Sequence, residues 1–191
     1  MATSFDFAAA RQTMVESQVR PADVTDTAIQ DAMRTVARET LCPDKAALAY
    51  ADAEIPYAPG RWLMRPRDVA KLLQALQPRR GERALAIAAP YAAAVLEAMG
   101  LQVERLDGED LTAAPAGPFD VAVCEGAVGA APQAWIDTLA PGGRLGVVER
   151  RGPVGKARLY LNNDGQIGSR EVFDSAAPLL PEFAPRATFA F

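Results

Sequence analysis

The first third of the chain has apolar residues at the spacing of amphipathic helices. The expected helices run over residues 5–19, from an N-cap at Thr25 or Asp26 to Val36, and over residues 66–76. Pro66 opens the last of them, and Pro78 closes it. The stretch from Cys42 to Trp62 has little periodicity and several prolines, which predicts an irregular surface segment.

From Arg83 onward, short apolar runs alternate with helical patterns. The expected strands are residues 84–88, 101–107, 119–127 and 144–150, and the expected helices follow Pro90 and Pro132, the second stopped by Pro141-Gly142-Gly143. Two further strand-like runs flank Asn162-Asn163-Asp164-Gly165, a hairpin signal. This order predicts an α/β fold with a mostly parallel sheet and an antiparallel C-terminal hairpin. We expect a single domain over 1–191, with an N-terminal helical region (1–80) and a sheet core (81–191).

Composition narrows the chemistry further. The 191 residues include no histidine, which excludes Ser-His-Asp and Cys-His hydrolases and histidine metal sites. The two cysteines, Cys42 and Cys124, are expected to be small buried hydrophobes. A net charge of −4 gives no basic field for nucleic acid or an anionic membrane. Without a long apolar run or a targeting segment, the sequence is typical of a soluble cytoplasmic protein.

Several segments resemble landmarks of the protein-L-isoaspartate O-methyltransferase family, in order and over nearly the whole chain. They are Met14–Arg20, Asp31–Glu39, Ala49–Asp52, Pro118–Asp120 and Leu139–Leu145. The resemblance implies a Rossmann-like class I methyltransferase fold and S-adenosylmethionine as cofactor. It also implies repair methylation of isoaspartyl carboxyls, with isoaspartyl-containing proteins or peptides as partners.

The family places a glycine-rich turn, similar to E-I-G-x-G-x-G-Y, after the first strand of the sheet. Here the corresponding residues are Ala86-Ile87-Ala88-Ala89-Pro90-Tyr91, without the acid or the glycines and about two residues shorter. Ala88 and Ala89 are therefore the positional equivalents of cofactor-binding glycines. Alanine adds a Cβ where the backbone must approach a ligand, and proline lacks an N–H donor. This pattern equally fits an ordinary tight turn from strand to helix.

By the same resemblance, Asp107 falls where an acid would accept the ribose hydroxyls, with Glu104 as the nearby alternative. Only residues 108–118 then separate Asp107 from Phe119. They could span about 36 Å when extended, too little for a helix plus a strand. We therefore predict that one strand and one helix are missing, although the segment could instead replace the deleted strand.

The acceptor side also departs from the family. Met64 occupies the family's serine position and cannot donate the hydrogen bond that a serine would, so no catalytic residue is assigned. Arg65 and Arg67 could attract a carboxylate substrate, although arginines in a first helical turn are usually solvated. Glu125 ends a strand at the ligand-binding side of the sheet, but a surface carboxylate is the favoured interpretation.

Three hypotheses follow. The favoured one is a methyltransferase-like pseudoenzyme with impaired S-adenosylmethionine binding. The first alternative is an active isoaspartyl methyltransferase, and the second is an α/β module that binds another small ligand. The aromatic tail (Phe183, Phe189 and Phe191) is expected to cover the core rather than an oligomer interface. Oligomeric state and protein partner are not determined by the sequence.

Overall fold

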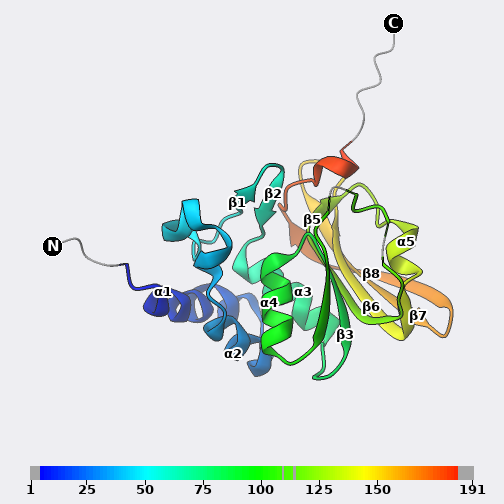
Figure 1. The fold of residues 1–191 in the computed structure, drawn as a ribbon, viewed down its shortest axis with the longest axis horizontal. Helices are drawn as coiled ribbons and strands as arrows, with labels where there is room; N and C mark the ends of the chain where they lie inside the picture. The colour runs from blue at the N-terminus through cyan, green and yellow to red at the C-terminus, as the bar shows by residue number, and fades with distance from the viewer. Residues whose placement is uncertain (1–4, 109, 114, 185–191) are drawn as a thin grey trace, which may run out of the picture.

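A six-stranded sheet forms the centre of the protein in the computed structural model, which describes residues 5–108, 110–113 and 115–184 (Figure 1). Its strands are β3 (Arg83–Ile87), β4 (Gln102–Leu106), β5 (Phe119–Val128), β6 (Leu139–Glu149), β7 (Gly155–Asn163) and β8 (Gln166–Ser175). They lie in the order β4-β3-β5-β6-β7-β8. Strands β4, β3, β5 and β6 pair in parallel, whereas β7 pairs antiparallel with both β6 and β8. The expected α/β fold with an antiparallel hairpin is confirmed.

Two helices, α3 (Pro66–Leu76) and α4 (Pro90–Ala98), pack on one face of the parallel strands. α2 (Thr27–Thr35) packs against these helices, and α1 (Phe7–Met14), which continues as a π-helical turn to Val19, packs against α2. Asp26 caps α2 by accepting hydrogen bonds from the backbone N–H groups of Ala28 and Ile29. The predicted N-terminal helices are therefore confirmed.

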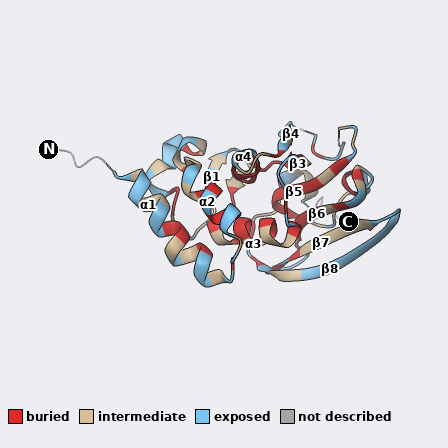
Figure 2. Ribbon diagram, turned by 90° about the horizontal axis from the view of Figure 1, so that it is seen from below, coloured by how far each residue is buried: buried red, intermediate tan, exposed pale blue. Residues whose placement is uncertain are grey.

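Alternate residues of β3 face two separate hydrophobic clusters, as expected for a strand that is buried on both sides. Ala84 and Ala86 pack with the helices, whereas Leu85 and Ile87 face the opposite cluster. Figure 2 shows the buried residues concentrated in α3, β5 and β6, while β8 is largely exposed. Both cysteines are buried, as predicted.

The prediction of an irregular surface segment before Trp62 is wrong in two respects. A hairpin of β1 (Ile55–Ala58) and β2 (Arg61–Leu63) forms there, turning at Gly60 with φ +69°. Cys42 and Tyr50 are also buried in the main cluster. Strands this short, with a proline and a register shift between them, cannot show alternation in sequence. Tertiary packing positions the two strands instead, because β2 packs against β5 and β1 packs against a 3₁₀ helix over Pro43–Leu48.

The helix after Pro132 is shorter than expected. α5 (Gln133–Ile136) ends before Leu139, which already pairs with Phe119 as the start of β6. Pro141-Gly142-Gly143 therefore interrupts the register of β6 rather than stopping a helix. Gly143 is needed because a Cβ would lie 2.8 Å from the Phe119 carbonyl oxygen.

The β7–β8 turn follows its sequence signal closely. Asp164 and Gly165 have φ angles of 51° and 93°, the left-handed pair that a two-residue hairpin turn requires. The Gly165 N–H also donates to Oδ1 of Asn162 over 2.7 Å. The expected antiparallel edge of the sheet is confirmed.

The connection from β4 to β5 contains no helix or strand among its described residues, 107–108, 110–113 and 115–118. β4 is thus an edge strand, and exposed charges on Glu104 and Arg105 protect it from pairing with other chains. The expected deletion is borne out, and the described part of the segment does not replace the lost strand. Leu111 is buried instead, and its carbonyl oxygen accepts a 2.7 Å hydrogen bond from Nε1 of Trp135.

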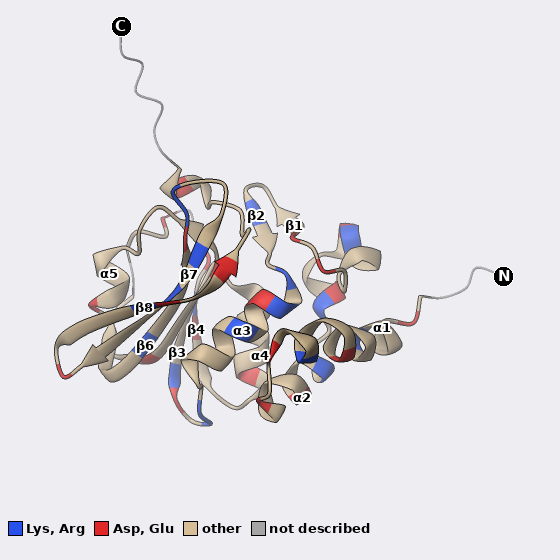
Figure 3. Cartoon of the chain, turned by 180° about the vertical axis from the view of Figure 1, so that it is seen from behind, with Lys and Arg blue, Asp and Glu red and all other residues tan. Residues whose placement is uncertain are grey.

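Charged residues of both signs are interspersed over the surface (Figure 3), as the acidic net charge and the absence of a basic field lead one to expect. In the part of the chain that the structure describes, no helix is long and apolar enough to cross a membrane.

Candidate functional site

The turn from β3 into α4 keeps a glycine-like backbone although it contains no glycine. Ala88 has φ +44° and is buried, and its N–H donates to the Leu106 carbonyl oxygen over 2.9 Å. The left-handed conformation is unfavourable for any residue with a Cβ, at a cost of about 1–2 kcal/mol. Ala89 is the N-cap residue, and Pro90 is the first residue of α4. The two alanines singled out in the sequence therefore lie at the carboxyl end of β3.

Glu125 is not the surface carboxylate expected from the sequence. Only 1% of it is exposed, and it lies at the N-terminus of α4. Its Oε1 accepts a hydrogen bond from the Ala92 N–H, and its Oε2 accepts one from the Met64 N–H over 3.4 Å. Burial raises the pKa of Glu125, and the nearby Arg38 charge opposes that effect. The sequence did hold a signal, because an acid inside an otherwise apolar strand requires partners when it is buried.

Arg38 is the second functional candidate, and sequence reasoning missed it. Its side chain is fully buried, with Nε donating to the Ala49 carbonyl over 2.7 Å and Nη2 to the Met64 carbonyl over 2.6 Å. The guanidinium lies 4.4 Å from the centre of the Tyr91 ring. Burial lowers the pKa of Arg38, while Tyr91 and Glu125 oppose the shift. Arg38 and Glu125 therefore form a buried cation and anion that share the backbone of Met64.

Met64, at the family's serine position, has a packing role in this structure. It is 1% exposed, and its Sδ accepts a hydrogen bond from the Gly126 N–H at 3.2 Å. With its own N–H and carbonyl held by Glu125 and Arg38, it has no group directed at a substrate. Neighbouring Arg65 and Arg67 pair with Glu54 at 3.0 Å and Asp52 at 3.1 Å, so their charges are already balanced.

Asp107 lies apart from this buried cluster, on a shallow pocket of about 410 Å³. The pocket is lined by Pro59, Arg61, Asp107, Gly108, Pro181 and Glu182. Asp107 itself is exposed, although neighbouring chain desolvates its carboxylate enough to raise its pKa against the opposing charges of Arg105 and Arg61. The alternative acid, Glu104, is exposed and lies 3.7 Å from Arg83. Of these two acids, Asp107 is the one that lines the pocket.

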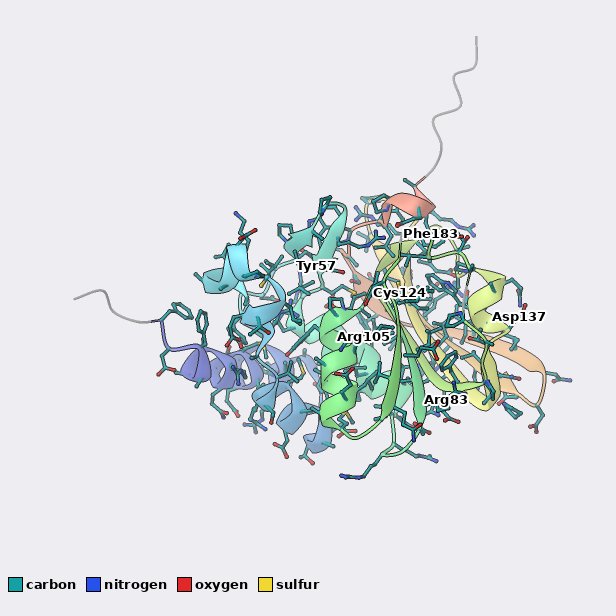
Figure 4. The ribbon with its side chains drawn as sticks, viewed as in Figure 1. Tyr57, Arg83, Arg105, Cys124, Asp137 and Phe183 are labelled. Carbon is teal, nitrogen blue, oxygen red and sulfur yellow. The ribbon has the colours of Figure 1, made fainter. Side chains whose placement is uncertain are left out.

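The C-terminal segment 177–184 crosses the same end of the sheet. The Leu180 N–H donates to the Ala127 carbonyl, and the Ala127 N–H donates to the Pro178 carbonyl, both over 2.8 Å. Glu182 forms a two-pronged ion pair with Arg61, and Phe183 meets Trp135 edge-on at 5.5 Å. Figure 4 shows Phe183, Cys124 and Tyr57 at this end, opposite Arg83. Phe183 thus covers the core as predicted, whereas Phe189 and Phe191 lie outside the described residues.

The site offers contacts for a ligand but few reactive groups. Burial raises the pKa of the Cys124 thiol, with Glu125 adding to the effect, so a thiolate is disfavoured. Within the described residues, no group of three or more metal-ligating side chains exists. The buried cluster therefore offers charge and hydrogen bonds to a ligand, and the Cys124 thiol is unsuited to act as a nucleophile.

The mostly parallel sheet, with a pocket beside the carboxyl end of β4, defines a Rossmann-like class I methyltransferase fold. A crystal structure of a Plasmodium falciparum protein-L-isoaspartate O-methyltransferase, in complex with S-adenosyl-L-homocysteine, superposes with a TM-score of 0.75. It is 14% identical and covers 90% of this chain and 98% of its own. A second protein-L-isoaspartate O-methyltransferase structure has a TM-score of 0.73 and 18% identity, covering 88% of this chain and 65% of its own.

Sequence relatives identify the family. A protein-L-isoaspartate O-methyltransferase of Methylorubrum extorquens is 35% identical over 189 aligned residues, covering 84% of this chain and 82% of its own. The protein-L-isoaspartate O-methyltransferase of Methylorubrum populi is 35% identical over 185 aligned residues, which cover 82% of this chain and 87% of the relative. No model of a known protein family matches the chain. On these relatives, the chain belongs to the protein-L-isoaspartate O-methyltransferase family.

Proposed function

We propose that this chain is a methyltransferase-like protein that binds S-adenosylmethionine weakly or not at all and does not transfer methyl groups. The observation that carries the proposal is the turn at Ala88-Ala89-Pro90. A bound cofactor needs free backbone N–H groups and close approach to the turn. The protein's own atoms take up several of these donors and the space beside them, so the residues present do not fit the group.

Three of the five residues from Ala88 to Ala92 offer no free backbone donor. The Ala88 N–H is bonded to Leu106, Pro90 has no N–H, and the Ala92 N–H is bonded to Glu125. The side chains of Ala88 and Ala89 are each 1% exposed, so their methyl groups fill space inside the protein. A ligand would have to displace these contacts before it could make its own.

The acceptor side supports the same proposal. Methyl transfer depends on holding the sulfonium and the nucleophilic carboxylate in line, so positioning supplies most of the catalysis. Met64 offers no donor to an isoaspartyl carboxylate, and Arg65 is paired with Glu54. Neither reactant would therefore be held in place.

Overall similarity favours the alternative, an active S-adenosylmethionine-dependent isoaspartyl methyltransferase acting on damaged proteins. Relatives with that name align over most of this chain. In that case, the pocket at Asp107 would hold the ribose, and the turn would adjust on binding. A protein that binds some other small ligand in this pocket is the third possibility.

Calorimetric titration with S-adenosylmethionine and S-adenosyl-L-homocysteine tests the proposal, with the Methylorubrum extorquens relative as positive control. We expect no binding heat from this chain and no methylation of an isoaspartyl peptide. Micromolar affinity would overturn the impaired-binding proposal, and turnover of the peptide would establish the enzyme.

A further inference from the structure

We propose that Glu125 is an internal ligand, whose carboxylate fills a carboxylate-binding site between α4 and the backbone of Met64. The inference deepens the proposed function, on which it rests. It identifies what occupies the buried polar cluster at the start of α4 and names small carboxylates as the ligand class that the site fits.

Two separate elements supply the donors of this site. The Ala92 N–H comes from the first turn of α4, and the Met64 N–H comes from the segment that precedes α3. Unbonded N–H groups and the helix dipole make a helix N-terminus favourable for an anion. Glu125 reaches it from β5, immediately after Cys124, whose partner in the sheet is Ile87 of β3. The acid that the family carries on β3 is absent, and a carboxylate from the neighbouring strand lies at the same end.

A buried cation completes the site. Arg38 is the positive charge that faces Glu125, and it also bonds the Met64 carbonyl. Its Nη1, and the hydroxyl of the fully buried Tyr91, have no hydrogen-bond partner among the described residues. Uncompensated polar groups of this kind are costly in a protein interior, so the enclosure is suited to an anion. The Cys124 thiol and the Tyr57 hydroxyl, which also lie near, are held neutral because burial raises the pKa of each.

The C-terminal segment packs on β5 beside this site. A Cβ built on Gly126, the residue after Glu125, would lie 2.8 Å from Leu180, so glycine is needed where this segment crosses β5. Glu125 itself is 1% exposed, so a carboxylate from solution would have to displace its side chain and would meet its like charge. The carboxylate end of an amino-acid-like ligand is therefore excluded from the wild-type protein.

The substitution Glu125→Ala tests the inference, because acetate has the same heavy atoms as the part of the side chain that is lost. The melting temperature of this variant should rise saturably with acetate, by roughly 3–6 °C at about ten times the dissociation constant. Equal concentrations of chloride or of the neutral isostere acetamide should not reproduce the rise. Rescue by chloride or acetamide to the same extent, or no rescue by acetate, would overturn the proposal.

Matched variants separate a specific site from a general salt effect. Asp68 is another buried carboxylate, 6% exposed, so Asp68→Ala should show no comparable response to acetate. Glu125→Gln keeps the shape and fills the space, so acetate should not stabilise it either. A response in either variant would contradict a site at Glu125.

A variant that fails to fold still tests the inference. If Glu125→Ala is unfolded in chloride, its refolding yield, measured by circular dichroism, should be restored by acetate alone. Failure in both salts would count against the inference. Its failure is distinguishable from failure of the proposed function, because the latter is decided by S-adenosyl-L-homocysteine binding to the wild-type chain.

Discussion

Ala88 holds a left-handed backbone conformation that is unusual for a residue with a Cβ. Its φ of +44° is the kind that glycine adopts freely, yet alanine is present and its methyl group is buried. Three effects of comparable size determine how Ala88 contributes to the unfolding free energy. The left-handed conformation costs about 1–2 kcal/mol, while the buried methyl contributes about 0.8 kcal/mol and the stiffer unfolded chain about 0.4–1 kcal/mol.

These magnitudes predict that Ala88→Gly is nearly neutral, within about 1 kcal/mol of the wild-type unfolding free energy. Ala86→Gly is the matched control, since Ala86 is equally buried but lies in ordinary strand conformation. It should cost about 1–2 kcal/mol more than Ala88→Gly, because it relieves no strain. Urea denaturation measures both, and equal losses in the two variants would show that Ala88 is not strained.

Asp68 provides a pH-dependent test at the same scale. It is buried in the first turn of α3 and accepts a 2.7 Å hydrogen bond from the Ser175 hydroxyl. Burial raises its pKa above the unfolded value, and the Ser175 bond and the Arg67 charge oppose the shift. The folded protein thus binds the Asp68 proton more tightly, so stability falls as pH rises from the unfolded pKa through the folded one.

Asp68→Asn should remove that part of the pH dependence. Relative to the variant, wild-type stability should decline as pH rises above about 4, the ordinary pKa of an aspartate, because the buried carboxylate then loses its proton. Denaturant midpoints of both proteins over this range provide the measurement. Parallel pH profiles would mean that Asp68 titrates alike in the folded and unfolded chains.

Among the elements, the C-terminal segment is held beside the Asp107 pocket by contacts that sequence patterns do not reveal. Burial alone would raise the pKa of Glu182, but the hydrogen bond to Arg61, a backbone hydrogen bond and the Arg61 charge together lower it. Partly exposed ion pairs contribute about 0.2–1 kcal/mol, too little to decide global stability. An ion pair of this strength is sufficient to change how often a terminal segment detaches locally from the rest of the fold.

Glu182→Gln should therefore speed amide hydrogen exchange in residues 177–184 by roughly 2- to 5-fold. Glu82→Gln is the matched control, because Glu82 and Arg144 form a similarly buried ion pair in contact with α3 and β5, away from this segment. It should leave exchange in 177–184 unchanged. Equal exchange in the wild type and Glu182→Gln would show that the ion pair does not hold the segment closed.

Elements with strong local signals were predictable, and those fixed by distant contacts were not. The spacing in α3, the Asp26 cap and the Asp164-Gly165 turn each act over a few residues, so the sequence displays them. The β1–β2 hairpin and the end of α5 depend on packing partners far along the chain. The local periodicity of the sequence therefore cannot predict elements that depend on such partners.

For the molecule as a whole, the sequence by itself determined the α/β fold class, the loss of the glycine turn and the missing strand before β5. These follow from residue order, from the absence of glycine and from a connection too short for more structure. Only the tertiary structure decided that Glu125 is buried near Arg38, and that Leu180 packs on β5 at the neighbouring Gly126. The cost of burying a charge depends on which partners the fold brings to it, and these partners come from opposite ends of the chain.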